Sequence, residues 1–245
     1  MKTAAISHVG KVRSINEDTI CVRTDQKPYY MMVADGMGGH AAGEVASKIT
    51  CESVCRYFEE HHTQRITKGV VLKAIEYANA NLQKEMQQNE ALQGMGTTLT
   101  FAGFDGKAIV VAQVGDSRAY YYNGNTIEKI TDDHTYVQYL IDSGVIKGHA
   151  AADYPFKNII TRAIGMKNLK VDFFHLEWKQ GDMLLLCSDG LTNYTDEEIL
   201  RNVLSSEITL QEKADKLVDI ALNGGGKDNI SVILAQHADE GEARI

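Results

Sequence analysis

The sequence predicts an α+β fold in which antiparallel strands and helices occupy separate stretches of the chain. Apolar residues recur with helical spacing in two successive segments, 41–60 and 66–88, which predicts a layer of two long helices. Four strand-like segments then follow between residues 97 and 130, separated by short turns. Consecutive hairpins of this kind indicate an antiparallel meander rather than βαβ units.

Three strands are expected before the two long helices. The segment 3–9 is mostly apolar and ends at Gly10, the segment 19–23 has strand-like composition, and the segment 29–34 is a continuous apolar run. The first helix then carries apolar residues close to helical period, at Val45, Ile49, Val54 and Phe58.

The later elements follow from turns and caps. Asp105-Gly106 and Asn123-Gly124 stand where hairpin turns belong, between strands expected at 97–104, 108–114, 117–122 and 126–130. A short helix is expected at 135–144, followed by strands at 171–177 and 183–188 and helices at 196–203 and 210–223. Thr195 and Thr209 are the expected N-caps of the last two helices. The final strand, 230–235, alternates little, so we expect it to be buried on both faces.

The composition excludes several classes of protein. The chain has 245 residues, of which 44% are hydrophobic and 24% charged, so we expect one globular domain over residues 1–245. The formal net charge of -8 argues against a nucleic-acid partner, because neutralising phosphates requires an excess of positive charge. No apolar run approaches the roughly 18 residues that span a bilayer, and residues 1–4 do not begin a signal peptide. We therefore expect a cytoplasmic monomer without membrane insertion.

The four cysteines have no C-x-x-C spacing. Cys51 and Cys55 lie four residues apart on an expected helix and share one of its faces. A metal pair is conceivable there, but we interpret them as two buried structural thiols, because a second ligand pair is missing and the expected compartment is reducing.

The segment 31–44 is the motif around which the chain is arranged. An apolar strand ends at Asp35, a glycine-rich turn follows, and His40 precedes a helix. The glycines of the turn lack a Cβ, so the backbone can bend sharply or approach a ligand closely. A hard metal ion accepts carboxylate and backbone carbonyl oxygens together, and a histidine beside it can act as acid or base. An ordinary strand–turn–helix junction is the alternative for this motif taken alone.

Three further acidic residues stand at strand ends or in tight turns. A second apolar strand ends at Asp189, Asp116 lies in a turn after Gly115, and Asp228 follows a run of glycines. For Asp116 taken alone, a simple turn role is the favoured alternative.

The loop between the first two strands adds Arg13, Glu17 and Asp18. Arg13 has the paired N–H groups that bind phosphate oxygens, and the two acidic residues can hold metal-bound water. In isolation, a solvated charged hairpin loop is the better explanation of these residues.

If the strands pack as antiparallel sheets, these acidic residues converge at one rim, where their repulsion would cause some to bind protons. Divalent cations remove this repulsion, and all-oxygen ligands favour Mg²⁺, Mn²⁺ or Ca²⁺ over Zn²⁺. Two cations about 3.5–4 Å apart can activate water for an in-line displacement, with Arg13 on the phosphate and His40 protonating the leaving alkoxide. The sequence therefore predicts metal-assisted phosphoester hydrolysis, and it contains no Cys-x5-Arg or Gly-x-Ser-x-Gly sequence for a covalent route.

The chain resembles the metal-dependent type-2C serine/threonine protein phosphatases in their compact bacterial form. The resemblance extends from about residue 6 to residue 235 and rests on six motifs in order. They are Arg13-x-x-Asn16-Glu17-Asp18, Val33–His40, Gly94–Thr98, Val114–Arg118, Cys187–Leu191 and Gly226–Asn229.

The resemblance implies a four-layer α-β-β-α sandwich of two antiparallel β-sheets flanked by helices. It implies that Asp35 bridges two metal ions and that the carbonyl of Gly36 binds one of them. Asp189 and Asp228 would complete the ligands of the other ion. Asp116 with Asp189 would hold the third ion of bacterial members. The implied cofactor is Mn²⁺ or Mg²⁺, as two or three ions.

The resemblance assigns the remaining residues to the surroundings of the metals. Glu17 and Asp18 would contact metal-bound water, and Asn229 would steady the loop of Asp228. Arg13 would clamp the substrate phosphate and His40 would be the general acid.

Residues 145–164 match the family's variable flap. Near the end of this segment, Arg162 is either a substrate contact or, in the simpler interpretation, an exposed charge.

The implied activity is hydrolysis of phosphoserine and phosphothreonine in proteins, including the targets of a bacterial Ser/Thr kinase that is itself an expected partner. One alternative keeps the fold and restricts the substrate to one regulatory protein. Another is an inactive scaffold, which should lack some of these residues, whereas this chain has every acidic residue together with Arg13 and His40. A calcium-binding module would show a D-x-D-x-D-G loop, which the chain lacks.

Overall fold

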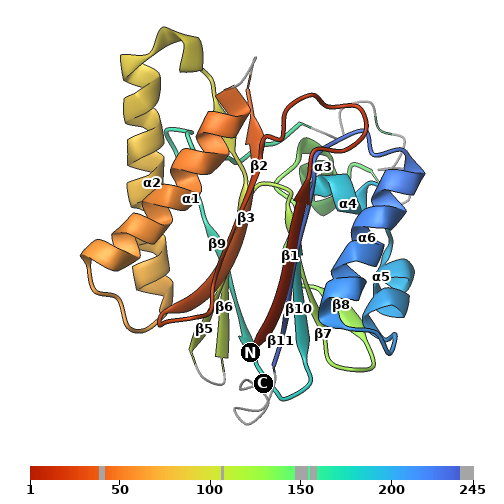
Figure 1. Cartoon of the computed structure of the whole chain (residues 1–245). Helices are drawn as coiled ribbons and strands as arrows, with labels where there is room; N and C mark the ends of the chain where they lie inside the picture. Colours follow the sequence, from red (N-terminus) through yellow and green to blue (C-terminus); the bar gives the residue numbers. More distant parts are fainter. Residues whose placement is uncertain (39–41, 106–107, 147–153, 155–158, 238–245) are drawn as a thin grey trace.

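Two antiparallel β-sheets lie face to face between two layers of helices, as the computed structural model of the chain shows (Figure 1). The structure describes residues 1–38, 42–105, 108–146, 154 and 159–237. The predicted α+β sandwich is confirmed.

The first sheet has the strand order β1-β11-β10-β7-β8, and its neighbours are all antiparallel. Its strands are β1 (Lys2–His8), β7 (Arg118–Tyr122), β8 (Ile127–Lys129), β10 (Met183–Cys187) and β11 (Ile230–Gln236). The strand β11, which lies between β1 and β10, is buried from Ile230 to Ala235, as its unbroken apolar character predicts.

The second sheet has the order β2-β3-β5-β6-β9, with the short strand β4 paired to β3. Its strands are β2 (Asp18–Arg23), β3 (Tyr29–Met37), β4 (Gly96–Thr97), β5 (Leu99–Asp105), β6 (Ala108–Val114) and β9 (Asp172–Glu177). The single strand expected at 97–104 is therefore two strands that are interrupted at Thr98.

The meander predicted for residues 97–130 is wrong. β5 pairs with β6 and β7 pairs with β8, but β6 and β7 belong to different sheets. Gly115 lies in the link between them with a φ of 102°, a left-handed conformation that suits glycine. A turn motif predicts that the chain reverses, but it does not specify which sheet the next strand joins.

Helices cover the outer face of each sheet (Figure 1). α1 (Ala42–Glu60) and α2 (Lys68–Gln88) cover the second sheet. The helices α4 (Asp189–Thr192), α5 (Glu197–Leu204) and α6 (Leu210–Gly224) lie on the first sheet, and α3 (Tyr136–Asp142) precedes the residues of the expected flap. The sequence does not predict α4 or the 3₁₀ turn η1 (Glu90–Leu92), because three or four residues are too few to show a helical period. None of the described helices has the length and apolar character needed to cross a bilayer.

The caps of α5 and α6 test two sequence predictions. Thr209 caps α6 in a reciprocal capping box with Glu212, which confirms that prediction. Thr195 does not cap α5, because Asp196 accepts the hydrogen bond from the N–H of Ile199 at 2.8 Å. The hydroxyl of Thr195 instead donates to the carbonyl of Leu191 at 3.1 Å.

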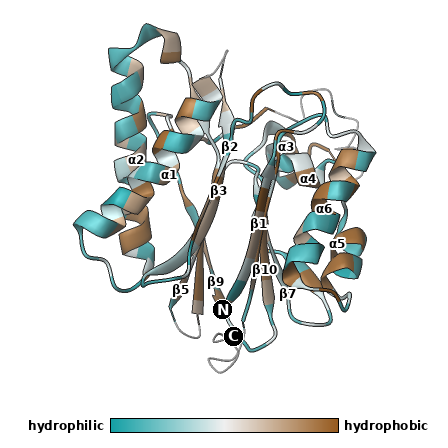
Figure 2. Ribbon diagram, in the orientation of Figure 1, coloured by the Kyte–Doolittle hydropathy of each residue, from teal (hydrophilic) through white to brown (hydrophobic). Residues whose placement is uncertain are grey.

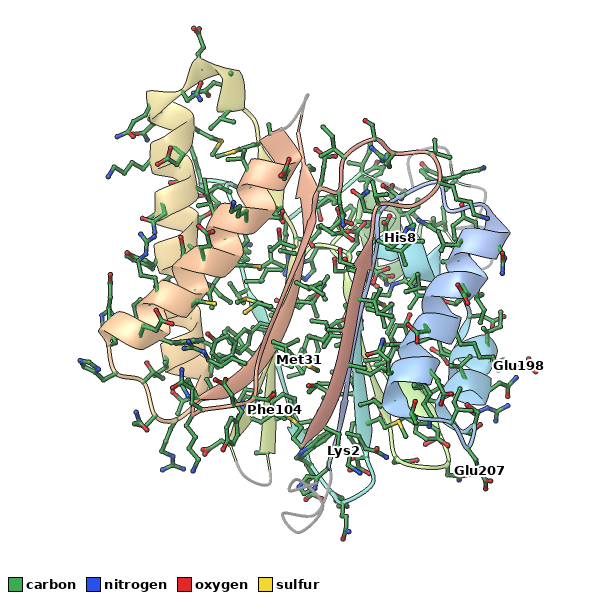
Figure 3. All side chains as sticks on the ribbon, viewed as in Figure 1. Lys2, His8, Met31, Phe104, Glu198 and Glu207 are labelled. Atoms are coloured by element: carbon green, nitrogen blue, oxygen red, sulfur yellow. The ribbon has the colours of Figure 1, made fainter. Side chains whose placement is uncertain are left out.

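Three apolar clusters hold the four layers together, and Figure 2 shows hydrophobic residues along the strands and on parts of the helices. The cluster between the sheets includes Met31, Phe104, Leu184 and Ile233, of which the first two are labelled in Figure 3. Full burial of one such side chain contributes roughly 1.5–3 kcal/mol. This core fixes the distance between the sheets, and with it the distance between residues at their ends.

Two glycines allow neighbouring backbone to lie directly against the strand ends. A Cβ on Gly36 would lie 2.0 Å from the carbonyl oxygen of Gly43, and a Cβ on Gly190 would lie 1.9 Å from that of Asn229. These glycines follow Asp35 and Asp189, so close packing holds the backbone next to both acidic residues.

We expect Gly190→Ala to lower the free energy of unfolding by about 1–3 kcal/mol, because the methyl group would overlap backbone that has no room to move. Gly69→Ala on α2 is the matched control, since nothing lies within 4 Å of its added Cβ. That change should stabilise the helix by up to about 1 kcal/mol. Urea denaturation measures both, and a Gly190→Ala protein as stable as the parent would contradict the packing described.

Candidate metal and phosphate site

Strand register brings acidic residues together at one end of the first sheet. The ends of β7, β10 and β11 coincide there, because Cys187 lies opposite both Arg118 and Val232. The acidic residues that adjoin these ends are Asp116, Asp189 and Asp228. This is the end of the sheet at which β1 finishes with His8, opposite the end marked by Lys2 in Figure 3.

The second sheet contributes two acidic residues to the same place. Asp18 opens β2 directly opposite Asp35 on β3. The pKa of Asp35 is raised well above its usual value, first by burial and then by the charges of Asp18, Asp189, Asp116 and Asp228. The charges of acidic residues from both sheets therefore act on the carboxyl group of Asp35. We call the five residues Asp18, Asp35, Asp116, Asp189 and Asp228 the acidic rim.

Other members of the acidic rim have pKa values shifted in the same direction. Burial, with the charges of Asp189 and Asp133, raises the pKa of Asp116 to about 7. Burial also raises the pKa of Asp18 to about 7, although its hydrogen bonds with Ser231 and Ser188 oppose the shift. The pKa of Asp189 is raised by burial and by Asp228. The rim therefore favours either bound protons or a bound cation.

Two buried oxygens at the site have no hydrogen-bond partner. They are Oδ1 of Asp18 and Oε1 of Glu17. Burial also raises the pKa of Glu17. Carboxylate oxygens that are crowded, buried and unpaired suit a hard divalent cation or the water molecules it retains.

The described residues contain no group of three or more His, Cys, Asp or Glu side chains that could hold a metal ion by themselves. Backbone carbonyls and water must therefore supply the remaining ligands. Mg²⁺ characteristically retains several waters and takes one or two carboxylates from the protein, so the available donors fit such an ion.

Arg13 lies at the acidic rim with 48% of its side chain exposed. Its Nη2 donates to Oδ2 of Asp228 at 2.9 Å, and this hydrogen bond is the main cause of the raised pKa of Arg13. Asp35 and Glu17 also act on the guanidinium group. The structure thus brings Arg13 from the first loop to the acidic residues, in a position open to solvent.

Asn229 holds the loop that carries Arg13 and Glu17. Its Oδ1 accepts from the N–H of Glu17 at 2.8 Å, and its Nδ2 donates to the carbonyls of Val9 and Ile15, each at 2.9 Å. The expected contact with its neighbour is present as well, because its N–H donates to Oδ1 of Asp228 at 3.0 Å. Asn229 therefore ties residues 9–17 to the start of β11, a link across the sequence that the motif alone does not predict.

Thr98 belongs to the site, although no role follows for it from the sequence. Its Oγ1 accepts from the N–H of Asp35 at 2.9 Å, and its own N–H donates to the carbonyl of Asp35 at 2.8 Å. The same Oγ1 lies 2.7 Å from Oγ of Ser117, the residue after Asp116. Thr98 thus connects acidic residues that the two sheets contribute, and the signal for it is its place in the Gly94–Thr98 motif.

The sequence does not predict two more side chains that support the acidic rim. Ser188 donates from Oγ to Oδ2 of Asp18 at 2.7 Å, and Nδ2 of Asn193 donates to Oδ2 of Asp189 at 3.3 Å. Asp18 is distant from Ser188 in the sequence, and Asp189 lies one helical turn from Asn193. Both contacts are therefore visible only in the folded structure.

The interpretation of Arg162 as an exposed charge is wrong. Its Nη1 lies 2.9 Å from both carboxylate oxygens of Asp172 and 3.2 Å from Nε2 of His134. Nδ1 of His134 accepts from the N–H of Gly115 at 3.1 Å, and burial lowers the pKa of His134. Arg162 is therefore part of a network that reaches the turn next to Asp116. Of the flap expected at 145–164, residues 147–153 and 155–158 lie outside the described residues, as does His40.

Comparison with known proteins decides the family. The model of the family described as Protein phosphatase 2C matches residues 7–223. The chain belongs to the protein phosphatase 2C family. This membership confirms the resemblance identified from the motifs, and with it the expected enzyme class, a protein-serine/threonine phosphatase.

Relatives and solved structures agree with the family. The serine/threonine phosphatase stp of Listeria monocytogenes is 37% identical over 233 residues, which cover 93% of this chain and 92% of the relative. The protein phosphatase PhpP of Streptococcus pneumoniae is 34% identical over 98% of this chain and 99% of its own. The catalytic domain of the phosphatase PstP in complex with two manganese ions superimposes with a TM-score of 0.87 at 33% identity, covering 97% of this chain and 98% of that one.

The raised pKa values make a prediction about stability. A carboxyl group whose folded pKa exceeds its unfolded value binds more protons in the folded state, so stability falls as pH rises towards the folded pKa. Without divalent cations, we expect the free energy of unfolding to fall by on the order of 1–3 kcal/mol between about pH 6.5 and pH 8. Asp116→Asn should reduce this fall, because one of the carboxyl groups with a pKa of about 7 is removed. Urea denaturation across this pH range tests the prediction. The range lies above the lowered pKa of His134, so that histidine does not titrate in it. Stability that rises with pH would contradict the prediction.

A second prediction concerns Thr98. Thr98→Val keeps the shape but leaves the N–H of Asp35 without its partner, so we expect the apparent affinity for Mn²⁺ to fall roughly 10-fold. Thr131→Val is the matched control, because it also removes a buried hydroxyl that accepts from a backbone N–H, that of Ala119 at 3.0 Å. Calorimetric titration with Mn²⁺ measures the affinity. Equal losses in the two variants would show that Thr98 has no particular effect on the rim.

Proposed function

We propose that this protein hydrolyses phosphoserine and phosphothreonine in other proteins with the help of divalent cations at the acidic rim. The observation that carries the proposal is the convergence of five acidic residues from both sheets, with the solvent-exposed Arg13 beside them. Family membership and the names of the relatives support the same reaction.

The acidic rim would hold Mn²⁺ or Mg²⁺ through Asp35, Asp116, Asp189 and Asp228, with the carbonyl of Gly36. The catalytic domain of PstP binds two manganese ions, which supports a site for two ions in this family. Asp116 with Asp189 would hold a third. When bound, such cations supply an activated water and neutralise charge on phosphoryl oxygens.

The side chains around the rim position the substrate and the water. Arg13 would point two parallel N–H groups at the phosphate oxygens that are not transferred, exchanging its hydrogen bond with Asp228 for the phosphate, because half of its side chain faces solvent. Glu17 and Asp18 each have an unpaired buried oxygen with which to orient water. We assign protonation of the leaving alkoxide to His40.

Arg13 is half exposed beside the rim and can meet a phosphate carried on the surface of a protein. We propose that the substrates include targets of a bacterial Ser/Thr kinase and the kinase itself. We further propose one catalytic domain over residues 1–245, with residues 145–164 as its flap. The cytoplasmic location and the monomeric state stay predictions.

Hydrolysis of a phosphothreonine peptide tests the proposal. We expect turnover with Mn²⁺ or Mg²⁺, none with EDTA, and a loss of more than roughly 100-fold in Asp35→Ala. Asp219→Ala, an exposed acidic residue on α6, is the control and should retain full activity. No turnover by folded protein with either metal would refute the proposal and favour a scaffold or an enzyme for one dedicated substrate.

A further inference from the structure

A second chemical site lies away from the acidic rim, where α1 packs against β2 (Figure 1). Cys21 on β2 and Cys55 on α1 are 34 residues apart, yet their Sγ atoms are 3.5 Å from each other. Helical spacing in the sequence suggests Cys51 and Cys55 as the pair. The fold instead places Cys51 in the interior, with its Sγ 3.9 Å from the carbonyl of Thr19.

The Cys21–Cys55 pair is accessible to small molecules. Both residues are only partly buried, whereas Cys51 and Cys187 are buried. An open groove of about 720 Å³ is lined by the pair together with Lys48, Arg56 and Glu59. Cys51 also borders this groove but is only 3% exposed, so a small polar oxidant reaches the thiols of Cys21 and Cys55 more readily than those of the two buried cysteines.

The surroundings favour a thiolate on Cys55. The pKa of Cys55 is lowered to about 7, mainly by the hydrogen bond from the Cys21 thiol. The Tyr30 hydroxyl and Arg23 lower it further, whereas burial and the charge of Glu59 act in the opposite direction. The same hydrogen bond raises the pKa of Cys21. The two thiols are thus unequal: Cys55 is the nucleophile and Cys21 keeps its proton.

The burial of Tyr30 adds to this description of the pair. Its side chain is completely buried, and its hydroxyl has no hydrogen-bond partner of ordinary geometry. The hydroxyl nevertheless lies within electrostatic reach of Cys55, which helps to raise the pKa of Tyr30 after burial. A thiolate on Cys55 is the acceptor that this buried O–H lacks.

We propose that Cys21 and Cys55 form an oxidation-sensitive thiol pair, which hydrogen peroxide converts into an intramolecular disulfide between β2 and α1. The Cys55 thiolate attacks one peroxide oxygen, the O–O bond breaks, and hydroxide leaves, so Cys55 becomes a sulfenic acid. The sulfur of Cys21 then attacks the sulfur of Cys55. The S–S bond forms, the S–O bond breaks, and water leaves with the proton of Cys21. Overall, two thiols lose two electrons and two protons, and peroxide is reduced to two waters.

The other two cysteines are not substrates for this reaction. Burial raises the pKa of Cys51, and burial raises the pKa of Cys187 to about 12. The disulfide would link α1 to β2, whose first residue, Asp18, belongs to the acidic rim. The proposal does not depend on the phosphatase reaction, so the two can fail separately.

The test is peroxide oxidation of the full chain, followed by denaturation, maleimide labelling and mass spectrometry. We expect two of the four cysteines to remain unlabelled by maleimide. Before labelling, the oxidised protein should weigh two hydrogens less than the reduced protein. Digestion should yield a linked peptide containing Cys21 and Cys55. Dithiothreitol should restore all four thiols. A disulfide between Cys51 and Cys55, or oxidation without any disulfide, would overturn the proposal.

Two variants separate the steps. In Cys21→Ser the reaction should stop at the sulfenic acid of Cys55, which dimedone traps, whereas Cys51→Ser should still form the disulfide. In the native parent protein, alkylation of Cys55 should be half-maximal near pH 7 and roughly 10-fold or more faster than that of Cys187. Equal reactivity of these two cysteines, or loss of the disulfide in Cys51→Ser, would contradict the assignment.

Discussion

Repulsion among carboxylates at the junction of two sheets is the constraint on which the site depends. Asp35 is surrounded by acidic residues of both sheets, and burial strengthens their mutual effect. Such a cluster is stable only if protons or cations neutralise it. The family's metal chemistry is therefore a consequence of how the sheets are joined, and the apolar core between them keeps the acidic residues close together.

A densely hydrogen-bonded backbone offsets this repulsion. Thr98 holds Asp35 and reaches Ser117, Asn229 holds the loop of Glu17, and Gly190 lets the carbonyl of Asn229 lie against α4. These contacts restrict relaxation of the rim, so the acidic residues cannot simply move apart. The same contacts hold the loop that carries Arg13 beside the rim.

β3 does not end at Asp35 as expected but continues to Met37, where it pairs with β4. The apolar strands that lead to Asp35 and Asp189 are nevertheless predictable from the runs that precede each Asp-Gly. The residues that support them are not. Thr98 and Ser188 act through contacts between distant segments, as does Asn229 apart from its expected contact with Asp228, and local pattern contains no information about distant contacts. The crossing of the chain between β6 and β7 and the meeting of Cys21 with Cys55 escape prediction for the same reason.

The central claim is that protons and cations compete for the same carboxylates, and calorimetric titration with Mn²⁺ in buffers of different ionisation enthalpy tests it most directly. Near neutral pH we predict binding with release of about one proton or more per protein, and less release in Asp116→Asn. Tight binding without proton release would show that the rim is already ionised. It would contradict the claim that burial and carboxylate repulsion together hold protons on the metal-free rim.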